Sequence, residues 1–364
     1  MALNFFKTNY LDAMSAGPHM VFKKPSYPIS SQLKAYLDRY KRSTEVPVHY
    51  DDLLRFSGSV SVYSQQDDDT LWVRVFYSDE ERKEIDVALK KIYSILHSDG
   101  SDNIFEDLSV DAIDYCTFGN SKPFRIKIRN IINDNYTYFY VKRSDASRIY
   151  GLELEHLLSP YNLNFLVSAD TLIEEHIAGI PGDVFSKHYL PLCTERQRAQ
   201  LAKEFVKFNE RCMIRLLGDM RAYNYVVIPV HDFDSVIHKI RAIDFDQQNF
   251  EGDLRVYRPQ FFPENAAMVE LIKTHLKRES VFQYKKEERS SLAKRALGAE
   301  SQLRRLVDSA KSDVLSTAEH IEMLGSQISQ FTGDQRFRKA DSMGVILELA
   351  LLFVIKNYRD LSVI

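Results

Sequence analysis

The sequence predicts an α+β protein whose first half is built from antiparallel strands and whose second half is mostly helical. Between residues 112 and 177, short runs of β-branched and aromatic residues follow one another and are separated by turn signals. After Pro263, apolar residues recur at helical spacing. The chain has 364 residues, which is above the size at which a single core usually stops growing, so we expect two lobes.

The composition is that of a globular protein, with 45% apolar residues, 27% charged residues and a net charge of −3. This balance indicates neither a nucleic-acid partner nor a membrane partner. Cys116, Cys193 and Cys212 form no CxxC pair, which favours a reducing, cytoplasmic compartment and argues against structural zinc. Residues 1–10 lack the pattern of a signal peptide, and the apolar run 347–355 is too short to span a bilayer, so we expect a buried helix there.

The first 107 residues are expected to form an N-terminal α+β extension. Runs of alternating residues predict strands at 59–64 and 70–77, joined by a polar turn. A helix is predicted over 79–96, because Ser78 can cap it and apolar residues recur every three or four positions. A polar loop over 98–107 closes the extension.

Residues 108–178 are expected to form a lobe of five antiparallel strands and one helix. The predicted strands cover 112–118, 124–130, 136–143, 165–168 and 171–177. The helix begins after Asp145 and ends near Ser159, because the residue before Pro160 disfavours helix. Gly179-Ile180-Pro181-Gly182 then breaks the chain.

Residues 179–364 are expected to form a second, mostly helical lobe. A long amphipathic helix is predicted over 194–216. The motif Leu-Gly-Asp-Met-Arg-Ala-Tyr-Asn-Tyr-Val-Val follows at 217–227, and Arg-Ala-Ile-Asp-Phe-Asp lies at 241–246. The cluster of basic residues at 273–286 is interleaved with acids, so we interpret it as a solvated helix face rather than a nucleic-acid site.

The residues of these two motifs suit a metal- and nucleotide-binding site. Asp219 and Asn224 are five positions apart and lead into an apolar strand, and an amide oxygen is a hard ligand that Mg²⁺ accepts. Asp244 lies between Ile243 and Phe245, inside what we expect to be a second apolar strand, where an isolated acid would be costly to bury. The alternatives are a turn aspartate, an asparagine at a strand start and an exposed strand end. Asp246 is either a second ligand or a solvated acid.

The two motifs resemble the catalytic loop and metal-binding segment of the protein-kinase-like fold, in particular its aminoglycoside phosphotransferase branch. The loop of that family reads roughly His-Gly-Asp-x-x-x-x-Asn. The resemblance covers residues 112–250; Leu217 stands where the family has histidine, and the hairpin at 229–239 is longer than in the family. It implies a bilobal kinase-like fold, with a five-stranded antiparallel N-lobe containing one helix at 108–178 and a mostly helical C-lobe at 179–364.

The resemblance also implies roles for single residues. Asp219 would be the catalytic base, Asn224 and Asp244 would hold Mg²⁺, and Lys142 would reach the phosphates of ATP. Either Glu153 or Glu155 would pair with Lys142. A helical wheel favours Glu153, which lies at the edge of the apolar stripe.

The remaining implied residues would bind the nucleotide. Tyr140 would stack on the base, Gly119 and Ser121 lie in the turn that would cover the phosphates, and the hinge segment with Glu175 and Ile177 would hold the adenine edge through its backbone. The alternatives without a functional role are an ordinary turn at Gly119 and Ser121, an ordinary strand end at Glu175 and Ile177, and a solvated lysine at position 142.

The resemblance implies an ATP- and Mg²⁺-dependent phosphotransferase that transfers the γ-phosphate to a hydroxyl of a small molecule, with a protein hydroxyl as the second choice of acceptor. The alternative is a non-catalytic kinase-like module that binds a nucleotide or acts through a protein partner. Such a partner would bind the N-terminal extension or the C-terminal helices.

Overall fold

The computed structural model describes residues 24–63, 69–97, 107–232 and 235–357. The expectations for residues 1–10, the turn at 65–68 and the loop at 98–106 lie outside these ranges. The described residues fall into two compact units. Within these ranges, unit 1 comprises 24–27, Ser147–Asn162 and 177–357, and unit 2 comprises Pro28–Ala146 and Leu163–His176.

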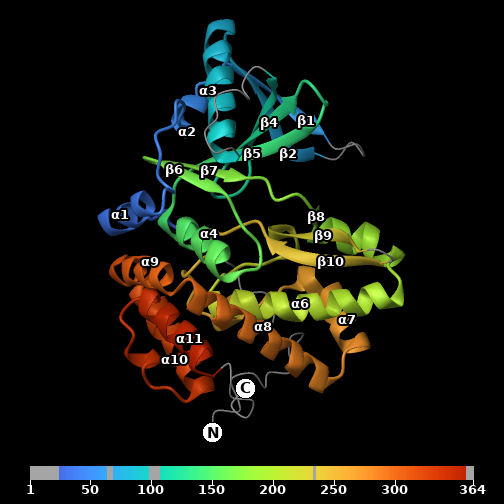
Figure 1. Ribbon diagram of the computed structural model, residues 1–364, viewed down its shortest axis with the longest axis vertical. Helices are drawn as coiled ribbons and strands as arrows, with labels where there is room; N and C mark the ends of the chain where they lie inside the picture. The colour runs from blue at the N-terminus through green and yellow to red at the C-terminus, as the bar shows by residue number, and fades with distance from the viewer. Residues whose placement is uncertain (1–23, 64–68, 98–106, 233–234, 358–364) are drawn as a thin grey trace. The chain divides into compact units, whose positions relative to one another are not determined.

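Unit 2 is built on one antiparallel sheet of seven strands in the order β1-β2-β3-β4-β5-β7-β6 (Figure 1). The strands are β1 (Gly58–Tyr63), β2 (Asp69–Phe76), β3 (Leu108–Cys116), β4 (Phe124–Asn130), β5 (Tyr136–Arg143), β6 (Phe165–Ser168) and β7 (Thr171–Glu175). Its helices are α1 (Ser31–Arg39), α2 (Tyr50–Leu53) and α3 (Asp79–His97).

The prediction of a five-stranded sheet is wrong, because the two strands of the expected extension join the other five. β2 pairs with β3, with Trp72 opposite Cys116 and Arg74 opposite Asp114. The sheet therefore continues across the boundary that we expected after residue 107. Because backbone hydrogen bonds join β2 to β3, the strands of the expected extension and the other five strands form one continuous sheet.

β3 also begins earlier than the predicted 112–118 and ends earlier. Its first residue, Leu108, pairs with Asn130, and the register shifts at a bulge between Val110 and Ala112. A bulge interrupts the alternation of side chains, so the pattern in the sequence indicated only the part of the strand beyond it.

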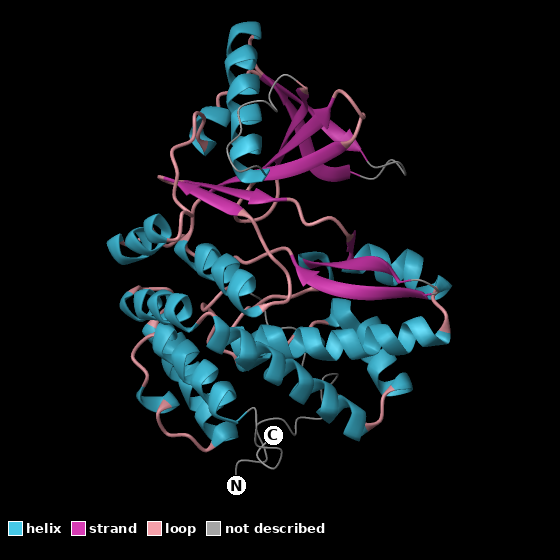
Figure 2. Ribbon diagram, viewed as in Figure 1, coloured by secondary structure: helices cyan, strands magenta, loops and turns pink. Residues whose placement is uncertain are grey.

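The seven-stranded sheet has one apolar face and one polar face. Helix α3 packs on the apolar face, where Leu89 and Ile92 lie in one buried cluster with Ile113, Phe124 and Phe139 (Figure 2). Successive side chains of a strand point to opposite faces. The opposite face therefore carries a row of polar and aromatic residues that are partners across neighbouring strands: Arg74, Asp114, Arg125, Tyr140 and Glu174.

Unit 1 is organised around α6 (Glu195–Arg215), close to the predicted 194–216. Thr194 accepts a hydrogen bond from the backbone N–H of Gln197, and the Gln197 side chain accepts from the backbone N–H of Thr194, which is a complete capping box. Leu216 ends the helix in the left-handed conformation, with φ of 55°.

Buried ion pairs join α6 to its neighbours. Glu155 of α4 (Ala146–Leu158) contacts Arg215, and Arg289 of α8 (Arg278–Gly298) donates to Glu210 at 2.6 Å. The predicted lobe boundaries placed α4 with the strands, but all of α4 after Ala146 belongs to unit 1. The reason is that the charged side chains of α4 form ion pairs within unit 1: Glu155 pairs with Arg215, and Arg148 pairs with Asp244.

A three-stranded sheet completes unit 1: β8 (Ile180–Pro181), β9 (Tyr225–Asp232) and β10 (Ser235–Ala242), in the order β10-β9-β8. The hairpin expected at 229–239 is confirmed as part of the antiparallel pair β9–β10, in which Val227 pairs with Ile240 and His231 with Val236. The prediction that Asp244 lies within a strand is wrong. β10 ends at Ala242, and Asp244 follows in a segment without regular structure.

The region after Pro263 is mostly helical, as predicted. Its α-helices are α7 (Ala266–His275), α8, α9 (Glu300–Ser312), α10 (Ala318–Thr332) and α11 (Met343–Asn357). The shorter helices of unit 1 are α5 (Gly182–Val184), η4 (Phe185–Tyr189), η5 (Leu190–Leu192), η6 (Ala222–Asn224), η7 (Leu254–Tyr257), η8 (Pro259–Phe261), η9 (Pro263–Asn265) and η10 (Phe337–Lys339).

Two expectations about the helical region have different outcomes. The apolar run at 347–355 lies in α11 and buries Leu347, Leu351 and Val354, which confirms the predicted buried helix. The cluster at 273–286 is not solvated throughout, because Lys285 of α8 is only 7% exposed. Among the described helices, none combines the length and the apolar character that a membrane crossing needs.

Candidate active site

In unit 1, hydrogen bonds bring the two sequence motifs together. The N–H of Gly218 donates to the carbonyl of Gln247 at 3.1 Å, and the N–H of Ile243 donates to the carbonyl of Asn224 at 3.0 Å. A Cβ at Gly218 would lie 3.0 Å from that Gln247 carbonyl oxygen, so the close approach favours glycine. The segment carrying Asp219 and the segment carrying Asp244 therefore run side by side.

Asp219 lies on a strained turn directly after α6. Its φ is 55°, a left-handed conformation that is uncommon for a residue other than glycine. Its N–H donates to the carbonyl of Val256 at 3.1 Å, which holds the turn in place. Residues in this backbone region are frequent at functional sites. The φ of Asp219 therefore indicates a functional position independently of the sequence motif.

Two neighbours hold the Asp219 side chain. Arg221 Nε donates to Oδ1 at 2.8 Å, and Asn224 Nδ2 lies 3.4 Å from Oδ2 and 2.7 Å from the Asp219 carbonyl oxygen. Because the amide nitrogen of Asn224 faces Asp219, its Oδ1 is the atom left to accept a donor or ligate a cation. Arg221 also donates from Nη1 to Glu264 Oε1 at 2.7 Å.

Burial raises the pKa of Asp219 to about 6. The hydrogen bond and the charge of Arg221 lower this pKa, and the charges of Asp244 and Glu264 raise it. A carboxylate whose pKa lies close to neutral pH is well matched to accepting a proton from a substrate. The pKa of the aspartate that the sequence singled out is therefore raised toward the range in which a carboxylate can accept a proton near neutral pH.

Asp244 and Asp246 face a cation from α4. Arg148 Nη2 donates to Asp244 Oδ1 at 2.8 Å, and Arg148 Nε donates to Asp246 Oδ1 at 2.8 Å. The N–H of Asp246 donates to Asp244 Oδ1 at 3.1 Å. Within the described ranges, no group of three or more His, Cys, Asp or Glu side chains is arranged to hold a metal ion.

In unit 2, Lys142 lies on the polar face of the sheet. Its Nζ donates to Glu174 Oε2 of the neighbouring strand β7 at 2.6 Å, and the two side chains are 7% and 6% exposed. The expected partner of this lysine was Glu153 or Glu155. Glu155 pairs with Arg215, and Glu153 accepts from Gln302 Nε2 at 3.4 Å. A pairing of Lys142 with Glu153 would join the two units and stays a prediction.

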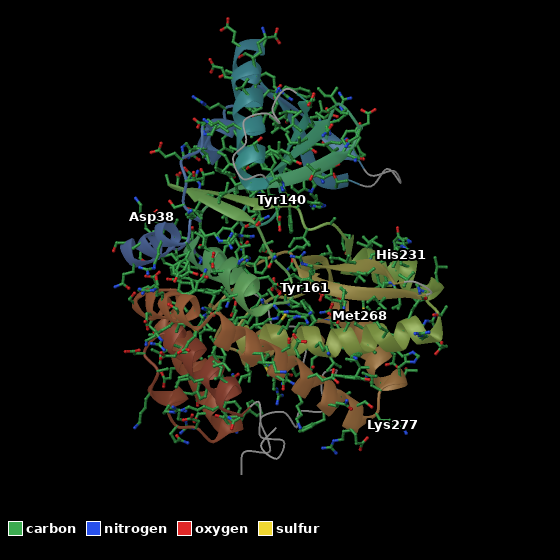
Figure 3. The ribbon with its side chains drawn as sticks, viewed as in Figure 1. Asp38, Tyr140, Tyr161, His231, Met268 and Lys277 are labelled. Atoms are coloured by element: carbon green, nitrogen blue, oxygen red, sulfur yellow. The ribbon has the colours of Figure 1, made fainter. Side chains whose placement is uncertain are left out.

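Aromatic rings and a guanidinium surround this lysine on the same face. Tyr140, labelled in Figure 3, lies with its ring centroid 5.6 Å from Lys142 Nζ and its hydroxyl 3.1 Å from His176 Nδ1. Trp72 lies with its ring centroid 6.4 Å from that of Tyr140, and Arg125 Cζ lies 4.5 Å from the Trp72 ring centroid. Such rings can stack on a flat ligand, and the cations can attract an anionic one.

The other predicted nucleotide-binding residues are found in a turn and at a strand end. Gly119 has φ of 83°, which favours glycine, and Ser121 lies in the same turn between β3 and β4. The strand predicted over 171–177 ends at Glu175, whose N–H donates to the carbonyl of Asn164 at 3.1 Å. Ile177 is buried and is the first residue of a unit 1 segment.

Sequence reasoning missed Arg148, Arg221, Glu174 and Glu264. Arg221 follows Asp219 by two positions, and this spacing could have marked it as a partner. Arg148 is 96 residues from Asp244, and no local signal links them.

Comparison with known proteins does not assign this chain to a family. A scan against protein-family models finds no match, and a search of curated proteins finds none.

Proposed function

We propose that this protein is an ATP- and Mg²⁺-dependent phosphotransferase with a bilobal kinase-like fold of the aminoglycoside phosphotransferase type. The γ-phosphate would pass to a hydroxyl of a small-molecule acceptor. The observation that carries the proposal is the Asp219 carboxylate, which is oriented by Arg221 and Asn224 and has a pKa of about 6.

The task assigned to Asp219 is that of the base. The acceptor oxygen attacks the γ-phosphorus, the bond from that phosphorus to the β–γ bridging oxygen breaks, and ADP leaves. The acceptor proton passes to Asp219. The Arg221 hydrogen bond at 2.8 Å keeps the carboxylate in one orientation, which reduces the entropy lost in reaching the transition state.

The task assigned to unit 2 is nucleotide binding. Lys142 would bind the phosphates, with Gly119 and Ser121 in the covering turn, and Tyr140 would stack on the base. Glu175 and Ile177 would hold the adenine edge, and Glu153 would support Lys142. The polar sheet face supports this assignment because a lysine, an arginine and three aromatic residues, Trp72, Tyr138 and Tyr140, lie within one set of ring and cation contacts.

Asn224 and Asp244 are the residues that would hold Mg²⁺, and bound Mg²⁺ would neutralise charge on the phosphates. Their oxygens have the right chemistry. The observed arrangement does not fit a bound ion, however, because Arg148 donates to Asp244 and Asp246. The proton transfer assigned to Asp219 therefore depends only on side chains of the protein and on the acceptor.

The same ion pair favours a second candidate, a non-catalytic kinase-like module that binds a nucleotide or a protein partner. A carboxylate already neutralised by an arginine of its own chain has less need of a metal. We further propose a cytoplasmic location, on the ground that Cys116, Cys193 and Cys212 are all free.

The single tryptophan of the chain, Trp72, lies on the proposed nucleotide face, which gives a direct test. Tryptophan fluorescence would be titrated with ATP, with Mg²⁺ and with both, and release of ADP would be followed with a panel of hydroxyl acceptors. Quenching by ATP together with acceptor-dependent ADP release is expected. Quenching without turnover for any acceptor would favour the non-catalytic module. No quenching at millimolar ATP would contradict the phosphotransferase and leave a module that acts through a protein partner.

The matched control is Lys142→Met, which removes the cation proposed to bind the phosphates. The ATP concentration that gives half-maximal quenching of Trp72 fluorescence should rise at least tenfold. Arg143→Met, which changes the next residue of β5, should leave quenching unchanged, because Arg143 contacts Asp51 and is 52% exposed.

A further inference from the structure

Arg148 occupies the position that a cation would take at the two aspartates of unit 1. Its side chain is 2% exposed, whereas those of Asp244 and Asp246 are 35% and 16% exposed. Nη2 donates to Asp244, Nε donates to Asp246, and Nη2 also contacts the Asp246 carboxylate. One guanidinium therefore bridges both acids.

This bridge explains how the cluster is stable. Two carboxylates so close together would repel each other, and a buried guanidinium without partners would carry a large desolvation penalty. The planar fork of arginine matches two acceptors at once. The backbone N–H of Asp246 adds a hydrogen bond to Asp244 Oδ1 at 3.1 Å, so that Asp244 Oδ1 accepts from two donors.

The guanidinium occupies Oδ1 of each of the two carboxylates that a metal would use. A Mg²⁺ ion takes carboxylate oxygens at about 2.1 Å in an octahedral arrangement. Asp244 Oδ1 already accepts from Arg148 Nη2 at 2.8 Å and from the Asp246 N–H at 3.1 Å, so both of its lone pairs are in use. With Arg148 in place, the formal charge of the three side chains is −1; without it, the two aspartates present −2. Attraction for a divalent cation is therefore much stronger once the guanidinium has left.

We propose that Arg148 is a positioning residue that acts as an internal cation and competes with a divalent metal for Asp244 and Asp246. A divalent ion binds only when the guanidinium leaves the two carboxylates, so Arg148 sets the metal affinity of the site. The inference deepens the proposed function, since it rests on Asp244 being a metal ligand, and it applies to metal binding whether or not the protein turns over ATP.

The competition is tested by measuring Mn²⁺ binding by electron paramagnetic resonance, without nucleotide, to the wild type and to Arg148→Gln. The variant keeps a polar side chain but removes the charge. It should bind Mn²⁺ at least tenfold more tightly than the wild type, and the added Asp244→Asn change should abolish that gain. Equal Mn²⁺ affinity in the wild type and in Arg148→Gln would overturn the proposal.

The matched control is Arg241→Gln, which removes the same charge three residues before Asp244. The Arg241 guanidinium lies 4.7 Å from the Tyr161 ring centroid and donates to the carbonyl of Asn162 at 3.0 Å. Its Mn²⁺ affinity should stay within twofold of the wild type. A gain equal to that of Arg148→Gln would show a general charge effect and would also overturn the proposal.

A measurement on the wild type keeps the test decisive if Arg148→Gln does not fold. The Nε–H of Arg148 is buried and hydrogen-bonded, so it should give a protected ¹⁵N signal that can be followed during Mg²⁺ titration. Saturating Mg²⁺ should shift this signal or expose it to exchange. An unchanged Arg148 signal in a protein that demonstrably binds Mg²⁺ at Asp244 would overturn the competition.

The Mn²⁺ binding experiment and the ATP turnover experiment can fail independently of each other. ATP turnover with equal Mn²⁺ affinity in wild type and variant would overturn the competition and leave the phosphotransferase standing. Tighter Mn²⁺ binding by Arg148→Gln in a protein that never turns over ATP would support the competition and remove the phosphotransferase.

Discussion

Arg221 donates from Nε to Oδ1 of Asp219 at 2.8 Å while its Nη1 reaches Glu264 at 2.7 Å. The guanidinium thus ties the turn after α6 to the short helix η9. The neighbouring residue Asn265 anchors η9, because its Nδ2 donates to the carbonyl of Met220 at 2.9 Å. Arg221, which orients the proposed base, is therefore held in turn by a contact from outside its own loop.

Replacing Asp219 with Ala should lower ATP turnover by about 10²–10⁴-fold, because a positioned general base contributes on this scale. ATP should still quench Trp72 fluorescence, since that tryptophan lies in unit 2. Turnover and quenching would be measured on the same preparation. Glu270→Ala, which removes an exposed acid of α7, serves as the control and should be unaffected. Wild-type turnover by Asp219→Ala would contradict the assigned role.

The pH dependence of kcat/KM should show an acid limb near pH 6, with activity rising as Asp219 loses its proton. Arg221 stabilises the charged carboxylate and lowers its pKa, while burial raises it. Arg221→Gln should therefore move the limb to higher pH. A steady-state profile from about pH 4.5 to about pH 9 on both proteins would show this, and a limb that moved to lower pH would refute the electrostatic argument.

Glu155→Gln should destabilise the fold by about 3 kcal/mol, because it leaves the Arg215 guanidinium buried without its charged partner. The Glu155 and Arg215 side chains are 3% and 2% exposed. Burial opposes ionisation of Glu155, but Arg215 and Ser159 hold its pKa below the usual value. Urea unfolding at pH 7 measures the loss. Glu300→Gln, which breaks the exposed pair with Arg304, should cost less than about 1 kcal/mol.

The pKa of Lys285 is about 8, lowered from 10.5 by burial, with Glu210 acting in the opposite direction. The unfolded chain therefore binds more protons between these two values, and stability should rise with pH from about 8 to about 10. Lys285→Met should raise the free energy of unfolding at pH 7 by about 1–3 kcal/mol and remove this slope. Unfolding at pH 7 and at about pH 9.5 would be compared. A wild type without any pH slope there would contradict the expectation.

Elements with strong local signals were predicted well. The bounds predicted for α6 from its apolar spacing lie within one residue of the observed ones, and β4 and β5 begin and end at the predicted residues. The sequence also indicated that Asp219 and Asn224 lie close together, because they are five positions apart in one turn. Interactions between neighbours in the chain leave a pattern that a sequence can show.

The sequence by itself determined the α+β class, the helical region after Pro263 and the choice of Asp219, Asn224 and Asp244 as candidate site residues. Only the tertiary structure decided that β1 and β2 join the sheet, that Lys142 meets Glu174, and that Arg148 meets Asp244. The physical reason is distance along the chain. Strand register and buried ion pairs are chosen by the packing of segments that are 32 or 96 residues apart, and residue type alone does not specify which opposite charge will be the partner.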